Sequence, residues 1–416
     1  MKYNKRVVVT GMGVISSLGL NYNEFWKNVK KGICGINLVE RFDTASFPTK
    51  VAAEIKNFHP EEFLNRKDIR RLDRYSHYAL IAAKEAFKSA KFDDSDKDNI
   101  RMGVIVTTST GGAESLIEQY EIFKEKGYKR ISPFVVPMMI PNMAAGRIAI
   151  EFGAKGFVEA VITACASSTN AIGDAYRVIQ RSEADIMFAG GADATLIPLT
   201  FAGFCAANKS MSKKTDPMDA CKPFDKDRDG FVMGEGASVL ILEEYEHAKK
   251  RGADIICEVV GYACTCDAFH FTAPEPDGDG AKRCMELALN DAEITLDKLN
   301  YINAHGTGTP LNDKMEAKAI NRLYNGKKYD ISITSSKSIT GHGMGAAGAM
   351  EAIITASSIK DGYVTPTIGT TDIDPECYVD GIVLEKGINK KINYGMSNSF
   401  GFGGHNASLI FKKMGD

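Results

Sequence analysis

Short runs of β-branched residues alternate with amphipathic segments along nearly the whole chain. The runs at 7–10, 103–107 and 185–189 are apolar and predict buried strands. The segment 75–91 places alanine and larger apolar residues at helical spacing and predicts a helix, and a second helix is expected around 24–27. This alternation of strands and helices is typical of an α/β fold.

Two stretches of the chain resemble each other. Residues 230–240 and residues 400–410 are both glycine-rich turns that lead into an apolar strand beginning with Ala-Ser. The segment 258–261 also resembles 7–11. An internal repeat of this kind indicates that the fold is duplicated.

The length of the chain fits two fused halves. At 416 residues it is too long for one simple core. We predict an N-terminal half, residues 1–255, that carries Cys165, and a C-terminal half, residues 256–416, that carries His305 and His342. We expect the active site at the junction of the halves, because pockets favour such interfaces.

The composition describes an ordinary globular enzyme. Hydrophobic residues make up 44% of the chain and charged residues 25%, and the net charge is −2. No bulk charge therefore recruits nucleic acid or a membrane surface. The first residues run straight into the strand at 7–10 and no long apolar run follows, so the sequence predicts neither a signal peptide nor a membrane-spanning helix. We expect a cytoplasmic protein.

The cysteines do not form a disulfide framework. Nine cysteines are too few for one in a chain of this length, and most lie in apolar settings, as Cys257 does. Cys264 and Cys266 suggest half of a metal site, but no second pair of ligands completes it. Only Cys165 has a reactive setting.

Two motifs imitate cofactor sites. The segment 11–16 follows a strand as a dinucleotide fingerprint does, but its third glycine is missing and no acidic residue follows a second strand. The segment 225–230 starts like an EF-hand loop, yet Gly236 stands where the last calcium ligand belongs. We interpret its aspartates as turn and salt-bridge residues. The sequence thus predicts no cofactor and no metal at these motifs.

Cys165 combines features that favour nucleophilic chemistry. An apolar strand ends at Cys165, and small residues that suit a helix follow it. A cysteine at a helix N-terminus feels unpaired backbone N–H groups and the positive end of the helix dipole, which favour the thiolate. The small neighbours also leave room for a substrate.

Two histidines lie in glycine-rich loops, where purely structural histidines are uncommon. His305 follows a strand and enters the loop 303–310, and His342 lies between two glycines. Lys337 is close enough in sequence to share the His342 loop. A nearby cation and a positive helix terminus lower the pKa of an imidazole, so both histidines are predicted to be neutral N–H donors.

These motifs resemble the β-ketoacyl-[acyl-carrier-protein] synthases, the condensing enzymes of fatty acid synthesis, and most closely the synthase II type. The resemblance runs nearly end to end, through segments 9–13, 132–143, 159–171, 223–231, 303–310, 335–343 and 398–404. It implies the thiolase-type fold, a duplicated five-layered αβαβα arrangement that usually dimerises. It also implies an acyl- and malonyl-loaded acyl carrier protein as partner.

The resemblance assigns roles to the site residues. Cys165 would accept an acyl group as a thioester, and His305 and His342 would stabilise the enolate that forms when malonyl-carrier protein loses carbon dioxide. The backbone N–H groups of Cys165 and Phe400 would form the oxyanion hole, and the Phe400 ring would gate the acyl tunnel. Lys337 would support the site electrostatically, with Glu351 in a buried polar network. Some relatives hold a structural monovalent cation here.

Binding surfaces are implied in the same way. The residues expected to contact substrate are Thr110, Phe134, Phe204, Thr272, Thr307, Thr309, Met344 and Phe402. Those expected to dock the acidic carrier are the basic residues Arg66, Lys67, Arg70, Arg71, Lys129, Arg130 and Lys209. The chain departs from the usual pattern at Thr110, at His405 and at the residues that follow Lys209. Acyl-length preference, one docking contact and the role of His405, as a structural substitution or a change to gating, therefore stay open.

Other functions share parts of this pattern. A degradative thiolase needs a second reactive cysteine near the C-terminus, where this chain has His405, and an initiating synthase pairs its cysteine with histidine and asparagine. A polyketide-type ketosynthase would have the same catalytic trio and stays the alternative. A catalytically silent partner subunit typically lacks the nucleophile, so the presence of Cys165 counts against it.

Overall fold

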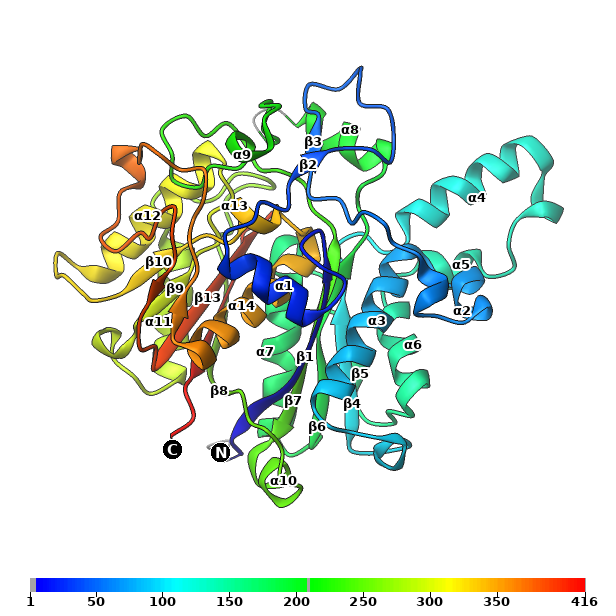
Figure 1. The fold of residues 1–416 in the computed structure, drawn as a ribbon, viewed down its shortest axis with the longest axis horizontal. Coiled ribbons are helices and arrows are strands. Elements are labelled where there is room, and N and C mark those ends of the chain that lie inside the picture. The colour runs from blue at the N-terminus through cyan, green and yellow to red at the C-terminus, as the bar shows by residue number, and fades with distance from the viewer. Residues whose placement is uncertain (1–4, 208–209, 416) are drawn as a thin grey trace.

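The computed structural model describes residues 5–207 and 210–415. Ten of its strands form one sheet, in the order β10-β9-β13-β14-β8-β1-β7-β6-β4-β5 (Figure 1). The strands of the first half are β1 (Val7–Ser16), β4 (Met102–Thr107), β5 (Val158–Glu159), β6 (Ile186–Asp193) and β7 (Gly236–Glu244). Those of the second half are β8 (Cys257–Cys266), β9 (Tyr301–Asn303), β10 (Ser332–Thr334), β13 (Tyr394–Gly401) and β14 (His405–Lys412).

The two halves repeat one topology. In the first half β7 pairs antiparallel with β1 and β6, while β4 runs parallel to β6 and β5. In the second half β14 pairs antiparallel with β8 and β13, while β9 runs parallel to β13 and β10. The segments that resemble each other in sequence lead into equivalent strands, β7 and β14. The predicted duplication is therefore confirmed.

The five strands from each half form one half-sheet of the large sheet. Helices cover both faces of each half-sheet, which gives five layers. The central layer is α7 (Ser167–Gln180) against α14 (Ala347–Asp361), between the two half-sheets (Figure 1). The outer layers are α3 (Arg74–Ser89) and α6 (Met143–Phe152) on one side, and α11 (Asp279–Asp291) and α12 (Pro310–Tyr324) on the other. This is the predicted αβαβα arrangement.

The remaining elements lie around this frame. The other helices are α1 (Tyr22–Lys30), α2 (Arg66–Arg71), α4 (Ala113–Lys126), α5 (Val135–Met139), α8 (Pro198–Ala206), α9 (Pro217–Ala220), α10 (Tyr245–Lys250) and α13 (Lys337–Thr340). Two small ribbons pair β2 (Asn37–Leu38) with β3 (Val51–Ala52) and β11 (Tyr363–Val364) with β12 (Ile388–Asn389). None of the described helices is long and apolar enough to cross a membrane.

Equivalent glycines let the outer helices approach the sheet. The pairing of β1 shifts register just before Gly11, and that of β8 shifts just before Gly261. A Cβ at Gly11 would lie 2.2 Å from the Ala86 carbonyl oxygen of α3, and a Cβ at Gly261 would lie 2.5 Å from the Ala288 carbonyl oxygen of α11. A side chain at either position would push the helix away, so the repeated sequence pattern has a packing cause.

The largest hydrophobic cluster spans both halves. A single cluster of buried side chains joins Val9 and Ile172 from the first half with Ile353 and Leu409 from the second. Residue 255 lies between α10 and β8, so the predicted boundary falls between elements. The division into two domains stays a prediction, because this cluster runs across the boundary.

The strand before Cys165 is shorter than predicted. It was expected to end at Cys165 but stops at Glu159, and the segment after it leads into a 3₁₀ turn, η4 (Ala164–Ala166). The segment 225–230 forms a turn in which Asp225 accepts backbone N–H groups of Thr371 and Asp372, and Arg228 pairs with Asp374. These contacts agree with the turn and salt-bridge interpretation.

Candidate active site

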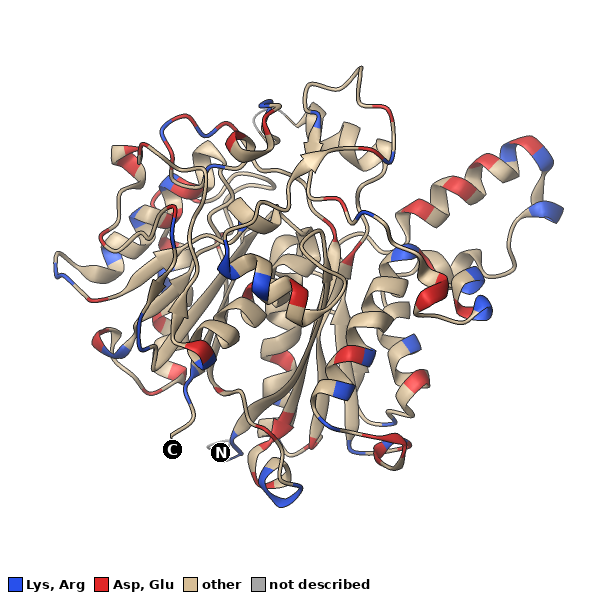
Figure 2. Ribbon diagram, viewed as in Figure 1, with Lys and Arg blue, Asp and Glu red and all other residues tan. Residues whose placement is uncertain are grey.

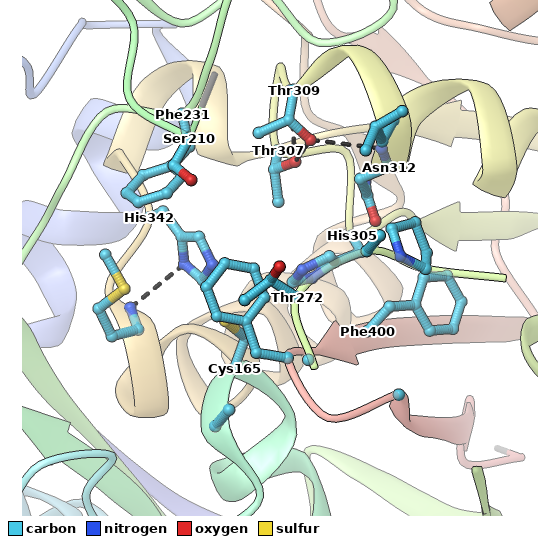
Figure 3. Close-up of a pocket in the computed structure, with 18 of the residues that line it drawn as sticks. Cys165, Ser210, Phe231, Thr272, His305, Thr307, Thr309, Asn312, His342 and Phe400 are labelled. Carbon is cyan, nitrogen blue, oxygen red and sulfur yellow. Dashed lines mark hydrogen bonds between the residues drawn. The ribbon is translucent and has the colours of Figure 1, made fainter. Parts of the chain in front are cut away.

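A cavity of about 500 Å³ lies where the two halves meet. Cys165 comes from the first half, whereas His305 and His342 come from the second. Figure 3 shows their side chains pointing into the same space, with Phe400 beside them. The predicted junction site is therefore present in the structure as a cavity.

Cys165 lies in the turn η4, directly before the central helix α7. The preceding residue, Ala164, has a φ of +52°, a left-handed conformation that is unfavourable for a residue with a side chain. The end of β13 runs beside this turn, and a Cβ on Gly401 would lie 3.1 Å from the Cys165 nitrogen. Glycine at 401 thus keeps space open next to the Cys165 backbone N–H.

Two buried polar side chains, Glu316 and Lys337, hold His305 from the side away from the cavity. The Glu316 carboxylate accepts the backbone N–H groups of His305 and Gly306 at 2.8 and 2.7 Å. Lys337 Nζ lies 3.2 Å from His305 Nδ1, donates to the His305 carbonyl at 2.7 Å and also contacts the Glu351 carboxylate. These contacts fix both the loop and the ring of His305.

His342 is held by the first half of the chain. Its backbone N–H donates to the Val232 carbonyl at 2.7 Å, and its carbonyl accepts the Gly234 N–H at 2.8 Å. The rings of Phe231 and His342 meet edge to face with centroids 5.4 Å apart. Residues of the first half, which carries Cys165, therefore position His342 of the second half. The site depends on these contacts between distant segments of the folded chain.

Both imidazoles are held as neutral donors at Nε2. Burial and the Lys337 charge lower the pKa of His305 and of His342 well below the usual value, so both rings are neutral near pH 7. The Met344 N–H donates to His342 Nδ1 at 3.2 Å, and a lysine amine, which only donates, faces His305 Nδ1. Each ring therefore carries its proton on the other nitrogen, Nε2.

The thiol of Cys165 differs from the sequence expectation. Burial raises its pKa to about 11, and the Lys337 charge and the Phe402 backbone N–H lower it only in part. The helix terminus is where the sequence predicts it, but desolvation outweighs the groups that favour the thiolate. Free Cys165 is therefore a thiol at neutral pH.

This pKa predicts how Cys165 reacts with iodoacetamide. Only the thiolate reacts, and a raised pKa means that its fraction keeps growing as the pH rises. The alkylation rate of Cys165 should increase by about tenfold per pH unit between pH 7 and pH 9, without a plateau below about pH 10. Peptide mapping by mass spectrometry separates Cys165 from the exposed Cys264 and Cys266. A plateau near pH 7 would contradict the burial effect.

The trio has the spacing of a metal site but not the right ring orientation. Cys165 Sγ and one ring nitrogen of each histidine lie within 4.8 Å of one another. A histidine that binds metal donates its second ring N–H to an acceptor. Here both Nδ1 atoms face donors, from Lys337 and Met344, so a metal at Nε2 would leave two N–H groups pointing at donors. The arrangement suits stabilisation of negative charge on oxygen instead.

The cavity brings together most of the residues expected to contact substrate. Its walls include Thr110, Phe204, Thr272, Thr307, Thr309, Met344, Phe400 and Phe402. Lys337 lies behind His305, outside the wall, with no exposed surface. Phe134 does not line this cavity, and its ring lies under the Arg71 guanidinium at 4.4 Å.

The basic residues expected to dock a partner lie at one side of the molecule. Arg66, Lys67, Arg70 and Arg71 lie on α2, and Lys129 and Arg130 lie on the turn η3 (Tyr128–Arg130) at the end of the α4 projection (Figure 2). All six are exposed and, within the described part of the chain, none is in an ion pair. Lys209 lies outside the described residues.

Three residues at the site were not singled out from the sequence. Glu316 holds the His305 loop, Phe231 packs on His342, and Asp193 accepts the Gly345 N–H close to His342. An acidic residue that ends an apolar strand was the available signal for Asp193. Glu316 gives no such signal, because its sequence distance from His305 does not reveal that the helix α12 turns back toward it.

The chain matches two family descriptions. Residues 4–248 match "Beta-ketoacyl synthase, N-terminal domain", and residues 256–371 match "Beta-ketoacyl synthase, C-terminal domain". Curated relatives match over their whole length. The chain is 46% identical over 413 residues, 99% of each chain, to the 3-oxoacyl-[acyl-carrier-protein] synthase 2 of Staphylococcus aureus strain COL. It is 46% identical over 409 residues, 98% of each chain, to the protein of that name from Synechocystis sp..

Solved structures give the same result. A β-ketoacyl synthase from Burkholderia phymatum is 37% identical with a TM-score of 0.90, covering 99% of this chain and 100% of its own. The ishigamide ketosynthase/chain length factor is 35% identical with a TM-score of 0.91 over the same shares. A ketosynthase in complex with its type II PKS acyl-carrier protein is 34% identical with a TM-score of 0.90 and equal coverage.

Proposed function

This chain belongs to the β-ketoacyl synthase family, and from that premise we propose that it lengthens acyl chains by two carbons in fatty acid synthesis. In this reaction an acyl group held on Cys165 condenses with a malonyl group that loses carbon dioxide, and acyl carrier protein delivers both groups. The observation that carries the proposal is the convergence of Cys165 Sγ with two histidines held as Nε2–H donors.

The first step loads the enzyme. The Cys165 sulfur attacks the carbonyl carbon of the acyl thioester on the carrier, and the oxygen of the tetrahedral intermediate lies near the backbone N–H groups of Cys165 and Phe400. The bond to the carrier sulfur breaks, and the carrier leaves as a thiol with the proton that Cys165 loses. A new thioester on Cys165 is the product. The space that Gly401 leaves beside the Cys165 nitrogen accommodates the oxygen.

The second step produces the nucleophile. The bond between the malonyl carboxylate and its α-carbon breaks, carbon dioxide leaves, and the electron pair forms an enolate on the carrier thioester. His305 and His342 donate their Nε2–H groups to the enolate oxygen. Because both rings are neutral and buried, these donors need no reorganisation, and one such donor is commonly worth about 3 kcal/mol.

The third step joins the two groups. The enolate carbon attacks the thioester carbonyl on Cys165, and the resulting oxyanion returns to the Cys165 and Phe400 N–H groups. Collapse of the intermediate expels the Cys165 thiolate and releases a β-ketoacyl group on the second carrier. One proton from solvent balances the overall reaction, because the first carrier departed with the proton of the resting thiol.

Two buried oxygen atoms would suit a structural monovalent cation of the kind that some relatives hold. Glu351 Oε2 and Ser397 Oγ are buried without a hydrogen-bond partner among the described residues. Asn303 connects the two residues, because it is paired in register with Ser397 and its side chain donates to the backbone carbonyl of Glu351. Oxygen ligands suit a hard cation, which would contribute structural support here.

Intact-mass analysis tests the proposed function. Purified enzyme is mixed with acyl-carrier proteins of several chain lengths and then with malonyl-carrier protein. The expected result is an acyl adduct on Cys165 that disappears as a β-ketoacyl product two carbons longer forms. If no chain length gave an adduct on folded enzyme with a competent carrier, the chain would be a non-catalytic partner.

A polyketide-type ketosynthase is the second candidate. One of the solved structures that resemble this chain, at 34% identity, is described as a type II PKS complex, whereas the 3-oxoacyl-[acyl-carrier-protein] synthase 2 relatives are 46% identical. The same mass analysis separates the two functions. A fatty acid enzyme should accept saturated acyl carriers, whereas a polyketide enzyme should prefer carriers that bear a β-ketone.

We propose that the basic residues on α2 and η3 dock the acidic carrier. A double variant, Arg66→Glu with Arg70→Glu, should raise the KM for acyl-carrier protein by about tenfold or more and make it less sensitive to salt, because docking charges act mainly on association. The KM for a small thioester of the same acyl group should not change. The control, Lys327→Glu with Lys328→Glu, makes an equal charge change on exposed lysines beyond α12. Equal effects of the two variants would contradict this docking surface.

We also propose that the enzyme is a homodimer that pairs through β5. This strand is at the edge of the sheet, so its outer backbone N–H and C=O groups can pair with a strand of a second copy. Apolar side chains in and beside the strand are exposed, namely Phe157 at 37%, Val158 at 42% and Ile162 at 46%. Ile162→Lys should weaken dimerisation at least about thirtyfold, measured by light scattering over a dilution series. Ile388→Lys, at a similarly exposed isoleucine on β12, should leave it intact. A wild-type monomer would overturn the proposal.

A further inference from the structure

The duplicated fold contains a second copy of the turn that carries the nucleophile. The turn η4 precedes the central helix α7, and the turn η6 (Met344–Ala346) precedes its counterpart α14. Each turn begins with a residue in the left-handed region, Ala164 at φ +52° and Met344 at φ +51°. The residue that corresponds to Cys165 is therefore Gly345, so the second copy lacks a nucleophile.

The strand ends beside the two turns differ in one decisive way. The strand β13 ends at Gly401, which leaves space beside the Cys165 nitrogen, and the equivalent strand β6 ends at Asp193. Asp193 is fully buried, and its Oδ2 accepts the Gly345 N–H at 2.6 Å. In the second copy, the Asp193 carboxylate thus accepts the backbone N–H of Gly345. The equivalent N–H in the first copy is that of Cys165, which in the proposed reaction binds the substrate oxygen.

The same carboxylate also holds the loop at the other side of the cavity. Asp193 Oδ1 accepts the Thr108 hydroxyl at 2.5 Å, and both oxygens accept the Ser109 N–H at 3.1 Å. The Thr108 hydroxyl in turn accepts the Gly111 N–H at 3.2 Å. Ser109 and Thr110 line the cavity, so one buried group joins the turn beside His342 to a wall of the cavity.

The turn that Asp193 holds determines the orientation of His342. The Met344 N–H, one residue before Gly345, donates to His342 Nδ1. A left-handed residue with a side chain persists only where its surroundings impose that conformation. The bond between Asp193 and Gly345 supplies such a constraint. A Cβ at 345 would lie 2.7 Å from Asp193 Oδ2 and 2.6 Å from the Ser109 nitrogen, so the two segments fit together only with glycine there.

We propose that Asp193 is a positioning residue, whose carboxylate fills the second half's counterpart of the oxyanion hole and thereby holds His342 as an Nε2–H donor. The inference rests on the proposed function, because its consequence falls on the decarboxylation step. Asp193 does not touch the substrate and acts through the turn 343–346. Acylation of Cys165 depends on the first copy of the turn and should be affected much less.

The variant Asp193→Asn tests the proposal, because an amide has one acceptor oxygen where the carboxylate has two. We expect carbon dioxide release from malonyl-carrier protein to fall at least about tenfold, while acylation of Cys165 changes by less than about threefold. The ¹⁵N spectrum of histidine-labelled enzyme should change for His342 from a single Nε2–H tautomer to a mixture. The matched control is Glu243→Gln, which removes a fully buried carboxylate at the opposite end of the neighbouring strand β7.

Three outcomes would overturn the assignment of Asp193. One is an equal loss of acylation and decarboxylation, with the same loss of thermal stability as in Glu243→Gln, which indicates a purely structural role. Another is unchanged decarboxylation. The third is a mixed tautomer of His342 in the unmodified enzyme, a measurement that needs no variant and so remains decisive if Asp193→Asn does not fold. Failure of the proposed function gives a different result, namely no acyl adduct on the wild-type enzyme.

Discussion

Replacing Cys165 by alanine is expected to lower the rate of condensation by about a thousandfold or more, because no other group can hold the acyl chain as a thioester. The thiol lies in the cavity beside both histidines, and none of the other cysteines in the described chain lines the cavity wall. The measurement combines intact mass, for the adduct, with the rate of β-ketoacyl product formation. Both signals should be lost together.

The specificity of this loss needs a matched cysteine. Cys284 is a fully buried free cysteine on α11, outside the cavity, and Cys284→Ala should retain condensation. Slow loss of carbon dioxide from malonyl-carrier protein should survive in Cys165→Ala, because His305 and His342 remain. Condensation within about tenfold of wild type in Cys165→Ala would exclude the covalent mechanism.

The second large effect is expected at the histidines. His305→Ala or His342→Ala should each lower carbon dioxide release by about a hundredfold, since each removes one preorganised donor from the enolate oxygen. Acylation of Cys165 should fall by less than about tenfold, because its oxyanion is stabilised by backbone N–H groups. Single-turnover measurements of adduct formation and of carbon dioxide release separate the two steps.

A buried histidine elsewhere serves as the control. His77 on α3 is 8% exposed, burial lowers its pKa to about 4, and it lies outside the cavity. His77→Gln therefore repeats the loss of a buried neutral imidazole without touching the site. If both active-site variants condensed at the wild-type rate, or lost acylation and decarboxylation equally, enolate stabilisation would be the wrong role for them.

The sequence alone determined the parts of this protein that are encoded locally. The alternation of apolar runs and amphipathic segments indicated the α/β class, because side-chain periodicity follows the backbone. The internal repeat indicated a duplicated fold, since Gly11 and Gly261 meet the same packing requirement. Cys165, His305 and His342 were recognisable because each lies in a short motif of small residues. Such motifs leave room for a substrate and are uncommon around purely structural cysteines and histidines.

The tertiary structure decided whatever depends on contacts between distant segments. Burial raised the pKa of the Cys165 thiol although the predicted helix terminus is present, because desolvation depends on every segment around the group. Phe134 was expected to contact substrate but lies away from the cavity. A sequence motif shows that a residue is near others along the chain, but it does not show where the folded chain places its side chain. The contact between Asp193 and Gly345 spans 152 residues, and it exists only because the two halves place equivalent turns beside equivalent strand ends.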